Sequence, residues 1–267
     1  MTNNLLLGAI VGDVCGSWYE WKRTKNPINV NLYLPQTSFT DDTIGTIATA
    51  YTLMNNISFT ESYQYWFRRY DAKGCGKLFK KWVYEDNPQP YGSWGNGSAM
   101  RVSPVAYVSK SLSKCLDLAK KSAECTHNST EGIKGAQCIA EYIWTCYNKN
   151  EINFNDILKK YYPEYITSTL DKIRPNYHFD SSCQGSVPVA VLSFLESESY
   201  EDCIIKAISM GGDADTLAAM AGSIAYAHYG KMSDKLANFV LEKLPKEFVD
   251  IIEQFDKFVF RLLCKKS

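Results

Sequence analysis

The sequence predicts an all-α protein, and three observations support this class. Apolar residues recur at intervals of three and four along most of the chain, which is the spacing of one helix face. Strand signals are few: residues 28–34 alternate, but their Asn residues and the flanking Pro27 and Pro35 favour a loop. Hydrophobic residues make up 45% of the chain and aromatic residues 13%, which is enough for one large buried core.

Helix-patterned segments follow one another along the whole chain. No Pro/Gly/Ser-rich linker, charge block or low-complexity stretch divides it, so we expect a single domain over residues 1–267. One further helix is expected to begin near residue 99. The other helices are expected at residues 5–17, 42–54, 61–70, 113–125, 131–147, 186–195, 200–210, 216–229, 234–244 and 247–263.

Charge and cysteine usage indicate the environment of the protein. Lys plus Arg and Asp plus Glu number 29 each, so the global charge gives no reason to expect binding to nucleic acid or to an anionic membrane. No apolar run approaches the roughly 18 to 20 residues that span a bilayer. The nine cysteines include no C-x-x-C pair, and the N-terminus shows no charged region followed by a cleavage site. These features predict a reduced, cytoplasmic protein.

The first predicted helix, residues 5–17, carries Gly8, Gly12 and Gly16 at every fourth position. Each glycine costs the helix roughly 1 kcal/mol of propensity, but a row of small residues lets another helix pack closely. Close packing is therefore their expected role. Two later helices, 42–54 and 216–229, are expected to be buried because each has an apolar face: Ile44, Ile47, Ala48 and Tyr51 in one, and Leu217, Met220, Ala221, Ile224 and His228 in the other.

Two short acidic turns, about 170 residues apart, each directly precede one of these buried helices. Taken singly, each turn is explained by N-capping, in which Thr or Asp accepts free backbone N–H groups. Taken together, four carboxylates would repel strongly unless they were protonated, kept apart or neutralised by cations. If the turns meet, two divalent cations supply the charge, and a set of oxygen ligands suits Mg²⁺ or Mn²⁺ better than Zn²⁺. The turns are Thr40-Asp41-Asp42-Thr43 and Asp213-Ala214-Asp215-Thr216.

A glycine-rich loop, residues 91–101, runs into the helix expected near residue 99. Such a loop can direct several backbone N–H groups at an anion, while Trp94 offers a flat face and Ser93, Asn96 and Ser98 offer hydrogen bonds. The G-K-[ST] ending of a P-loop is absent, so the motif taken alone is interpreted as a structural turn. Beside a metal site, it favours a phosphate-bearing ligand.

Together with further motifs, these segments resemble the ADP-ribosylglycohydrolases, the family of the dinitrogenase-reductase-activating glycohydrolase and the vertebrate ADP-ribosylhydrolases. The resemblance runs in order from about residue 5 to residue 230, and residues 234–263 are expected to be packing helices. It rests on these motifs: Gly12-Asp13, Gly16-Ser17 with Glu20, Phe39-Thr40-Asp41-Asp42-Thr43, Tyr91-Gly92-Ser93-Trp94-Gly95-Asn96-Gly97-Ser98-Ala99-Met100-Arg101, Thr126-His127-Asn128, Gly132-Ile133-Lys134-Gly135-Ala136 and Gly211-Gly212-Asp213-Ala214-Asp215-Thr216.

The resemblance implies an orthogonal helical bundle that holds two Mg²⁺ or Mn²⁺ ions. It also implies an enzyme that hydrolyses the glycosidic bond between ADP-ribose and an acceptor. The implied substrate is an ADP-ribosylated protein or a small-molecule ADP-ribose derivative, with nucleic acid only as a modified substrate, and the chain is expected to be a monomer. Glu20 stands at the place of the family's catalytic or gating acid. By position, the implied metal ligands are Thr40, Asp41, Asp42, Asp213, Asp215 and Thr216, and the implied substrate-binding residues are Gly92, Ser93, Trp94, Gly95, Asn96, Gly97, Ser98 and His127.

Several neighbouring residues have structural interpretations. Asp13 is expected to bond backbone or side chains beneath the site, and Arg101 to pair with the anionic centre or with Asp13. His127, next to Thr126, is otherwise explained as a hydrogen-bonding residue at a helix end. The core rather than the pocket is expected for Tyr161, Tyr162, Tyr177 and His178.

The chain departs from the family pattern in two places. Bacterial relatives often have His-Pro where this chain has Ser129-Thr130, and often Ser where Ala214 stands. The first departure affects the adenosine contacts. The segment 16–20 resembles the branch that cleaves oxygen-linked ADP-ribose more than the arginine-directed branch.

Two other function classes stay open: a dinuclear hydrolase that cleaves a phosphate ester or the pyrophosphate, and a non-catalytic ADP-ribose-binding protein.

Overall fold

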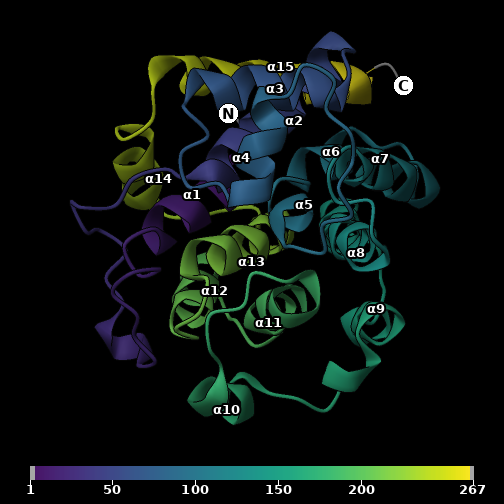
Figure 1. Cartoon of the computed structure of the whole chain (residues 1–267). Coiled ribbons are helices and arrows are strands. Elements are labelled where there is room, and N and C mark those ends of the chain that lie inside the picture. The colour runs from purple at the N-terminus through teal and green to yellow at the C-terminus, as the bar shows by residue number, and fades with distance from the viewer. Residues whose placement is uncertain (1–3, 265–267) are drawn as a thin grey trace.

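Helices form almost all of the regular structure in residues 4–264, which are the residues that the computed structural model describes (Figure 1). No strand occurs within that range, and the single isolated bridge joins Gly95 to Ser182. The predicted all-α class is confirmed. The α-helices are α1 (Leu7–Gly16), α2 (Asp41–Asn55), α3 (Phe59–Arg69), α4 (Lys77–Tyr84), α5 (Gly97–Met100), α6 (Ser103–Val108), α7 (Leu112–Glu124), α8 (Thr130–Tyr147), α9 (Phe154–Tyr161), α10 (Leu170–Ile173), α11 (Cys183–Leu195), α12 (Tyr200–Ile208), α13 (Ala214–Tyr229), α14 (Asp234–Leu241) and α15 (Lys246–Cys264), with short 3-10 turns at Pro27–Asn29, Pro163–Tyr165 and Arg174–Asn176.

The helix pair α1 and α13 lies at the centre of the molecule. A Cβ atom at Gly12 would come within 2.1 Å of the Ala218 carbonyl oxygen, and one at Gly16 within 2.5 Å of the Asp215 Cα. The glycines therefore let the two backbones touch, as expected. Helices α8, α11 and α12 surround α13 on its other sides (Figure 1), and α1 is buried along its whole length.

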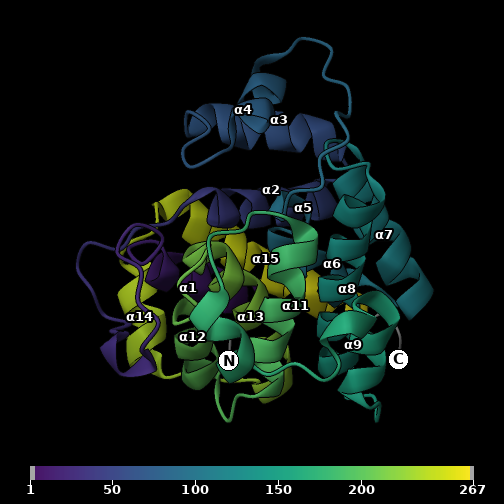
Figure 2. The same ribbon diagram turned by 60° about the horizontal axis from the view of Figure 1, so that its bottom comes forward.

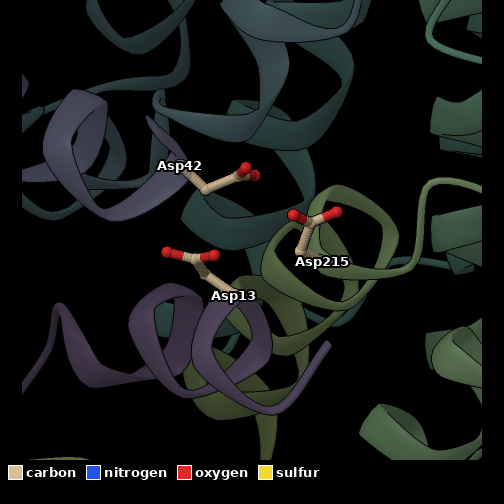
Figure 3. A group of neighbouring side chains, drawn as sticks. All are labelled: Asp13, Asp42 and Asp215. Atoms are coloured by element: carbon tan, nitrogen blue, oxygen red, sulfur yellow. The ribbon is translucent and has the colours of Figure 1, made fainter. Parts of the chain in front are cut away.

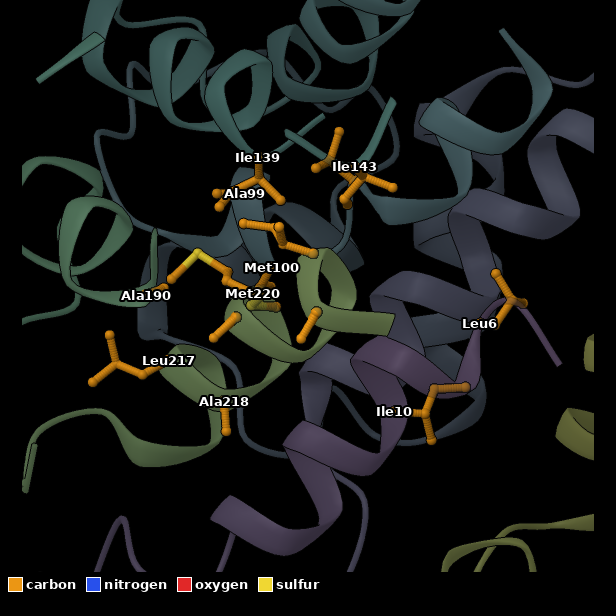
Figure 4. Close-up of a cluster of buried hydrophobic side chains, with 14 of the residues drawn as sticks. Leu6, Ile10, Ala99, Met100, Ile139, Ile143, Ala190, Leu217, Ala218 and Met220 are labelled. Atoms are coloured by element: carbon orange, nitrogen blue, oxygen red, sulfur yellow. The ribbon is translucent and has the colours of Figure 1, made fainter. Parts of the chain in front are cut away.

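The core continues from this pair toward α5 and α8. Figure 4 shows Ile10 on α1, Met220 on α13 and Ile139 on α8 within one buried cluster. The predicted faces of α2 and α13 are buried except for Tyr51, which is partly exposed, and His228, which is exposed. The described residues share one hydrophobic core cluster. That they form a single domain over residues 1–267 stays a prediction, and residues 1–3 and 265–267 lie outside the described part.

Helices α3 and α4 form an arm above α2, at the top of Figure 2. Ser58 caps α3, and the α4 end is fixed to α3 by side-chain bonds to backbone carbonyls: Arg68 Nε donates to the Val83 carbonyl at 2.7 Å, and Gln64 Nε2 to the Glu85 carbonyl at 2.7 Å. Among the described helices, α4 packs mainly on α3. The arm thus overhangs the rest of the molecule from one side.

Some sequence-based expectations differ from the structure. Helices α4, α6, α9 and α10 are short and were not expected, whereas residues 28–34 form the expected loop, which begins within the 3-10 turn Pro27–Asn29. Tyr161, Tyr162 and Tyr177 are buried, but the core interpretation of His178 is wrong because this side chain is exposed.

The cysteines from Cys15 to Cys203 form no disulfide. Within residues 4–264, each helix is too short or too polar to cross a bilayer.

Candidate active site

The two acidic turns meet at the centre of the molecule. Asp13 from α1, Asp42 from the start of α2 and Asp215 from the start of α13 are all buried, and each offers a carboxylate oxygen within 4.8 Å of the other two (Figure 3). The predicted meeting of the turns is therefore present in the structure. Asp13 was expected to be structural and was not among the implied ligands, but it belongs to the same cluster.

Asp13 also holds the first turn in shape. Its Oδ1 accepts a hydrogen bond from the Thr40 hydroxyl at 2.6 Å, and its Oδ2 accepts from the backbone N–H groups of Thr40 at 2.9 Å and Thr43 at 3.0 Å and from the Thr43 hydroxyl. These bonds to backbone and side chains are those that its structural interpretation predicts. Thr40 is the N-cap residue of α2, and its hydroxyl accepts from the Asp42 N–H at 3.4 Å. Capping thus accounts for Thr40, and Asp13 fixes the whole turn.

The second turn is held differently. Asp213 is the N-cap residue of α13, but no side-chain capping bond is made there. Its Oδ2 accepts from Asn96 Nδ2 at 2.9 Å, so the glycine-rich loop supports it from outside. The Thr216 hydroxyl donates to Asp42 Oδ2 at 3.2 Å and joins the two turns. Within the turn, the Thr216 N–H donates to Asp215 Oδ1 at 3.0 Å. The second turn therefore takes its shape from this bond and from contacts with other parts of the chain.

The carboxylates of this cluster lack a positively charged partner among the described side chains. Burial, reinforced by neighbouring carboxylates, raises the pKa of Asp41 to about 7 and the pKa values of Asp42 and Asp215 well above the ordinary range. Within residues 4–264, no Lys or Arg forms an ion pair with Asp13 or with the acids of either turn. Asp42 Oδ1 is buried without any hydrogen-bond partner. An orphaned oxygen among carboxylates and hydroxyls fits hard divalent cations.

A cavity of about 600 Å³ opens above the carboxylates. Its floor includes Thr40, Asp41, Asp213, Asp215 and Thr216, which are five of the six implied ligands; the sixth, Asp42, lies buried beneath them. The glycine-rich loop forms one wall, and the segment from Gly74 to Phe79, leading into α4, forms another. The volume is within the range of small-molecule sites.

The glycine-rich loop is pinned by backbone bonds. The Asn96 N–H donates to the Ser181 carbonyl at 2.8 Å, and the Cys183 N–H to the Trp94 carbonyl at 2.9 Å. Of the implied substrate-binding residues, those lining the cavity are Ser93, Gly95, Asn96, Gly97 and His127. The other three lie elsewhere: Gly92 and Trp94 are exposed outside the lining, and Ser98 is buried with its hydroxyl donating to the Gly132 carbonyl at 2.7 Å.

His127 is a buried, neutral side chain at the cavity wall. Burial lowers its pKa well below the usual range, and the charge of Arg101 adds to the effect. Its Nδ1 lies 2.7 Å from the Thr126 hydroxyl, which itself accepts a bond from Arg101 Nη2 at 2.8 Å. The Thr126 hydroxyl can donate its proton to His127 Nδ1 at 2.7 Å or to the Ala123 carbonyl at 3.5 Å. The shorter bond is the stronger one, which favours the tautomer protonated at Nε2. A Cβ atom at Gly97 would lie 3.1 Å from Nε2, so this donor faces the loop and cavity.

The expected pairing of Arg101 with Asp13 or with the anionic centre is wrong. Its side chain is only 1% exposed and turns toward α7, where Nη2 donates to the Ser122 carbonyl at 3.1 Å and to Thr126. Its guanidinium carbon lies 4.0 Å from the Tyr63 ring centroid. Aromatic faces, the Ser122 carbonyl and the Thr126 hydroxyl thus take the place of a carboxylate partner.

Glu20 lies at the cavity rim just after α1. It is half-buried, and burial followed by the charge of Asp213 raises its pKa above the usual range. The loop that carries it is tied across the rim by Lys25, whose Nζ donates to the carbonyls of Arg174, Pro175 and Tyr177 at 2.8 to 2.9 Å. This tether places a carboxyl group next to the cavity without burying it fully.

Sequence reasoning missed several lining residues. The segment Gly74–Phe79 carried no motif, and Phe179 and Ser181 lie in a loop without any pattern. For Asp13 a signal existed: it is the single charged residue in an otherwise apolar helix. A buried carboxylate in such a helix requires strong partners, which here are the turn and any bound cation.

In this helical bundle, two helix N-termini that are remote in sequence and one mid-helix Asp form a buried carboxylate cluster below a ligand-sized cavity. These features define a class of candidate metal-dependent enzymes. The sequence profile of the ADP-ribosylglycohydrolase family matches residues 3–263. This chain belongs to that family, and membership supports an ADP-ribosyl hydrolase activity.

Similar proteins occur in all three domains of life. ADP-ribosylhydrolase ARH3 of Homo sapiens is 26% identical, with 84% of each chain covered. ADP-ribosylarginine hydrolase Tri1 of Pseudomonas putida is 24% identical, covering 98% of this chain and 81% of its own. An uncharacterised protein of Archaeoglobus fulgidus is 27% identical, covering 83% and 85%. A solved structure described as an ADP-ribosylglycohydrolase-related protein complex matches with a TM-score of 0.69 and 20% identity over 98% of both chains, which supports the fold.

Proposed function

We propose that the protein hydrolyses the glycosidic bond between ADP-ribose and an acceptor, releases ADP-ribose, and uses two Mg²⁺ or Mn²⁺ ions. The observation that carries this proposal is the buried carboxylate cluster on the floor of a cavity of about 600 Å³. Relatives named as ADP-ribosylhydrolases support the reaction class. The raised pKa values and the orphaned Asp42 oxygen support the cations.

The cations would be held by the two turns. We assign Thr40, Asp41 and Asp42 from one turn and Asp213, Asp215 and Thr216 from the other as ligands, and add Asp13 as the residue that shapes the first turn. When bound, divalent ions supply Lewis-acid polarisation and an acidified water, both suited to an oxocarbenium-like transition state. The Asn96 amide, bonded to Asp213 Oδ2, would orient that ligand from the second sphere.

The chain's own side chains would manage protons and orientation. Glu20, with a raised pKa at a half-buried rim position, can hold a proton for the leaving group or take one from water, or can close over the site. His127 Nε2 and the N–H groups of the glycine-rich loop would bind the nucleotide part of the substrate, with Ser93 and Asn96. The aromatic ring of Phe179 at the rim would limit water access.

The expected substrates are an ADP-ribosylated protein or a small ADP-ribose derivative. The segment Gly16-Ser17-Trp18-Tyr19-Glu20 supports an oxygen-linked rather than an arginine-linked acceptor. Equal numbers of acidic and basic residues, 29 each, offer no global attraction for nucleic acid, which would enter only as a modified substrate. We also propose that the chain acts as a monomer in the cytoplasm.

The first test is hydrolysis of arginine-, serine- and O-acetyl-linked ADP-ribose with and without Mg²⁺ or Mn²⁺, with products identified by mass. Metal-dependent release of ADP-ribose from one substrate is expected. AMP as product would instead indicate pyrophosphate cleavage, and tight ADP-ribose binding without turnover would indicate a non-catalytic binding protein.

Variants of the two turns connect this activity to the site. Asp41→Ala and Asp213→Ala should each lose cation binding and turnover while remaining helical by circular dichroism. The matched control is Asp234→Ala, which removes an exposed Asp from the first turn of α14 and should change neither property. Full activity in either site variant would refute the two-turn metal site.

A further inference from the structure

An exposed cation, Arg23, stands at the mouth of the cavity on the strap, residues 20–25, that follows α1. Its Nε donates to the Glu20 carbonyl at 3.1 Å, and its guanidinium carbon lies 5.1 Å from the ring centroid of Phe179. Glu20 and Phe179 both line the cavity, although they belong to segments remote in sequence. Arg23 therefore joins two parts of the cavity rim.

The guanidinium of Arg23 has no carboxylate partner. Within residues 4–264 it forms no ion pair, and neither of its Nη groups has a hydrogen-bond acceptor. The acidic residue beside Phe179 is engaged elsewhere: Asp180 Oδ1 accepts from the Ser182 N–H at 2.8 Å, and its Oδ2 faces Gly185. The positive charge of Arg23 is thus left uncompensated at the mouth.

Contacts of Lys25 keep the strap, and with it Arg23, in this place. Lys25 Nζ donates to three backbone carbonyls of segment 174–177 at 2.8 to 2.9 Å. A Cβ atom built on Gly211 would lie 3.1 Å from Lys25 Cγ, so the Lys25 side chain also packs on the residues before the second acidic turn. These contacts join the strap to the segment that leads to Phe179. The guanidinium can leave the mouth only by losing both of its own contacts.

The charge of Arg23 acts where the acceptor would leave the cavity. Burial and the charge of Asp213 raise the pKa of Glu20, whereas the charge of Arg23 lowers it, so the field of this cation reaches the rim carboxyl. In the proposed reaction the scissile bond lies between the floor and Glu20, and the acceptor extends past Glu20 toward the mouth. A cationic acceptor would meet a like charge there, while cations bound on the floor would offset the attraction of its carboxylates.

We propose that Arg23 is a specificity-determining residue that excludes cationic acceptors and thereby favours neutral, hydroxyl-linked ones. The inference rests on the proposed function, because it assigns the acceptor class of the same cavity. Arg23 acts by like-charge repulsion of the wrong acceptor, rather than by a contact with the ADP-ribosyl group. A purely structural role of the contact between Arg23 and Phe179 predicts instead that all acceptors are affected equally.

The measurement is the ratio of kcat/KM for an arginine-linked to that for a serine-linked ADP-ribosyl peptide of otherwise identical sequence. A uniform loss of activity cancels in this ratio. We expect Arg23→Gln to raise the ratio about threefold and Arg23→Glu about tenfold, as for one or two unit charges at roughly 8 Å near water. Arg23→Lys keeps the charge and should keep the wild-type ratio.

Salt and a remote variant provide the controls. Screening should raise the wild-type ratio as ionic strength increases, and should change the ratio of Arg23→Gln less. Arg261→Gln removes an exposed Arg from α15, outside the cavity lining, and should leave the ratio unchanged. An unchanged ratio in both Arg23→Gln and Arg23→Glu, or a wild type that prefers the arginine-linked peptide, would overturn the inference while leaving the proposed hydrolysis intact.

Binding separates this inference from the proposed function. If the wild type hydrolyses neither peptide, calorimetric affinities for the two peptides with Mg²⁺ present report the same preference. Tighter binding of the serine-linked peptide, with the preference lost in Arg23→Glu, would support the role of Arg23 even though the glycohydrolase activity had failed. Equal wild-type affinity for both peptides, or binding of neither, would overturn it.

Discussion

The two acidic turns have similar sequences but different support. The first, Thr40–Thr43, is fixed by Asp13, which lies one helix away and accepts bonds from two backbone N–H groups and two hydroxyls. The second, Asp213–Thr216, has no capping bond and depends on Asn96 and on Thr216 reaching Asp42. The difference teaches that one buried carboxylate shapes the first turn, whereas the second turn is held by contacts with neighbouring segments of the chain.

The largest effect is expected where α1 and α13 bring the turns together. Gly12→Ala would place a methyl group 2.1 Å from the Ala218 carbonyl oxygen, between two backbones that cannot separate cheaply. We expect a loss of about 3 kcal/mol of unfolding free energy, near the upper end for overpacking. Chemical denaturation measures it. Gly76→Ala, which has free space around it, is the control; equal stability of the two variants would contradict the close packing.

The second largest effect is expected from removing the support of the first turn. Asp13→Ala leaves the buried N–H groups of Thr40 and Thr43 without an acceptor, which should cost about 2 kcal/mol even after relief of carboxylate repulsion. Cation binding should also be lost. Denaturation and calorimetry with Mn²⁺ measure the two effects. If Asp13→Ala bound Mn²⁺ normally, the first turn would not need its support.

Cation removal should affect the protein in a pH-dependent way. Asp41 has a pKa near 7 in the cation-free fold and about 4 when unfolded, so the folded state binds more protons between these values. The stability of the cation-free protein should therefore fall as pH rises from about 4 to about 7. Cation at one fixed concentration, twenty times its Kd at pH 8, should restore about 1.8 kcal/mol at pH 8 and less at pH 5, where protons compete for the carboxylates. Melting temperatures with EDTA or Mn²⁺ measure this, and an equal gain at both pH values would contradict it.

The smallest effect is expected at the outer support of the second turn. Asn96→Ala removes the amide that bonds Asp213 Oδ2, and should weaken cation affinity about tenfold with little change in stability. Asn238→Ala, an exposed Asn on α14, is the matched control. A Mn²⁺ titration distinguishes the two variants. If Asn96→Ala bound Mn²⁺ as well as the wild type, the second turn would not depend on the Asn96 amide.

Local patterns predicted much of the fold and the meeting of the two acidic turns. Glycine spacing predicted that α1 packs closely, and the repeated acidic turns predicted that residues 170 apart meet. The short, basic α4 escaped prediction because eight residues contain too few periods to be distinguished from a loop. Asp13 belongs to the carboxylate cluster because of the way α1 crosses α13, and the Arg101 side chain takes its direction from contacts with Tyr63 and α7. A local sequence pattern contains no information on either kind of long-range contact.

The roles of individual site residues remain predictions. Position within a motif indicated Ser93, Asn96 and His127, and these line the cavity. The same motif also indicated Trp94 and Ser98, which lie elsewhere in the loop because alternate residues of an irregular backbone point in different directions. Side-chain direction, rather than residue type, is therefore what the sequence failed to provide.

Contact between α1 and α13 also constrains the order in which the newly made chain can mature. About 200 residues separate Gly12 from Ala218, so at a synthesis rate of 5 to 20 residues per second α1 waits roughly 10 to 40 s for its partner. During that time α1, which is buried along its whole length in the folded protein, lacks the helix α13 that covers most of it. A nascent chain that stops before α13 would therefore expose this apolar helix to chaperones and would carry only Asp13 and Asp42 of the three cluster carboxylates.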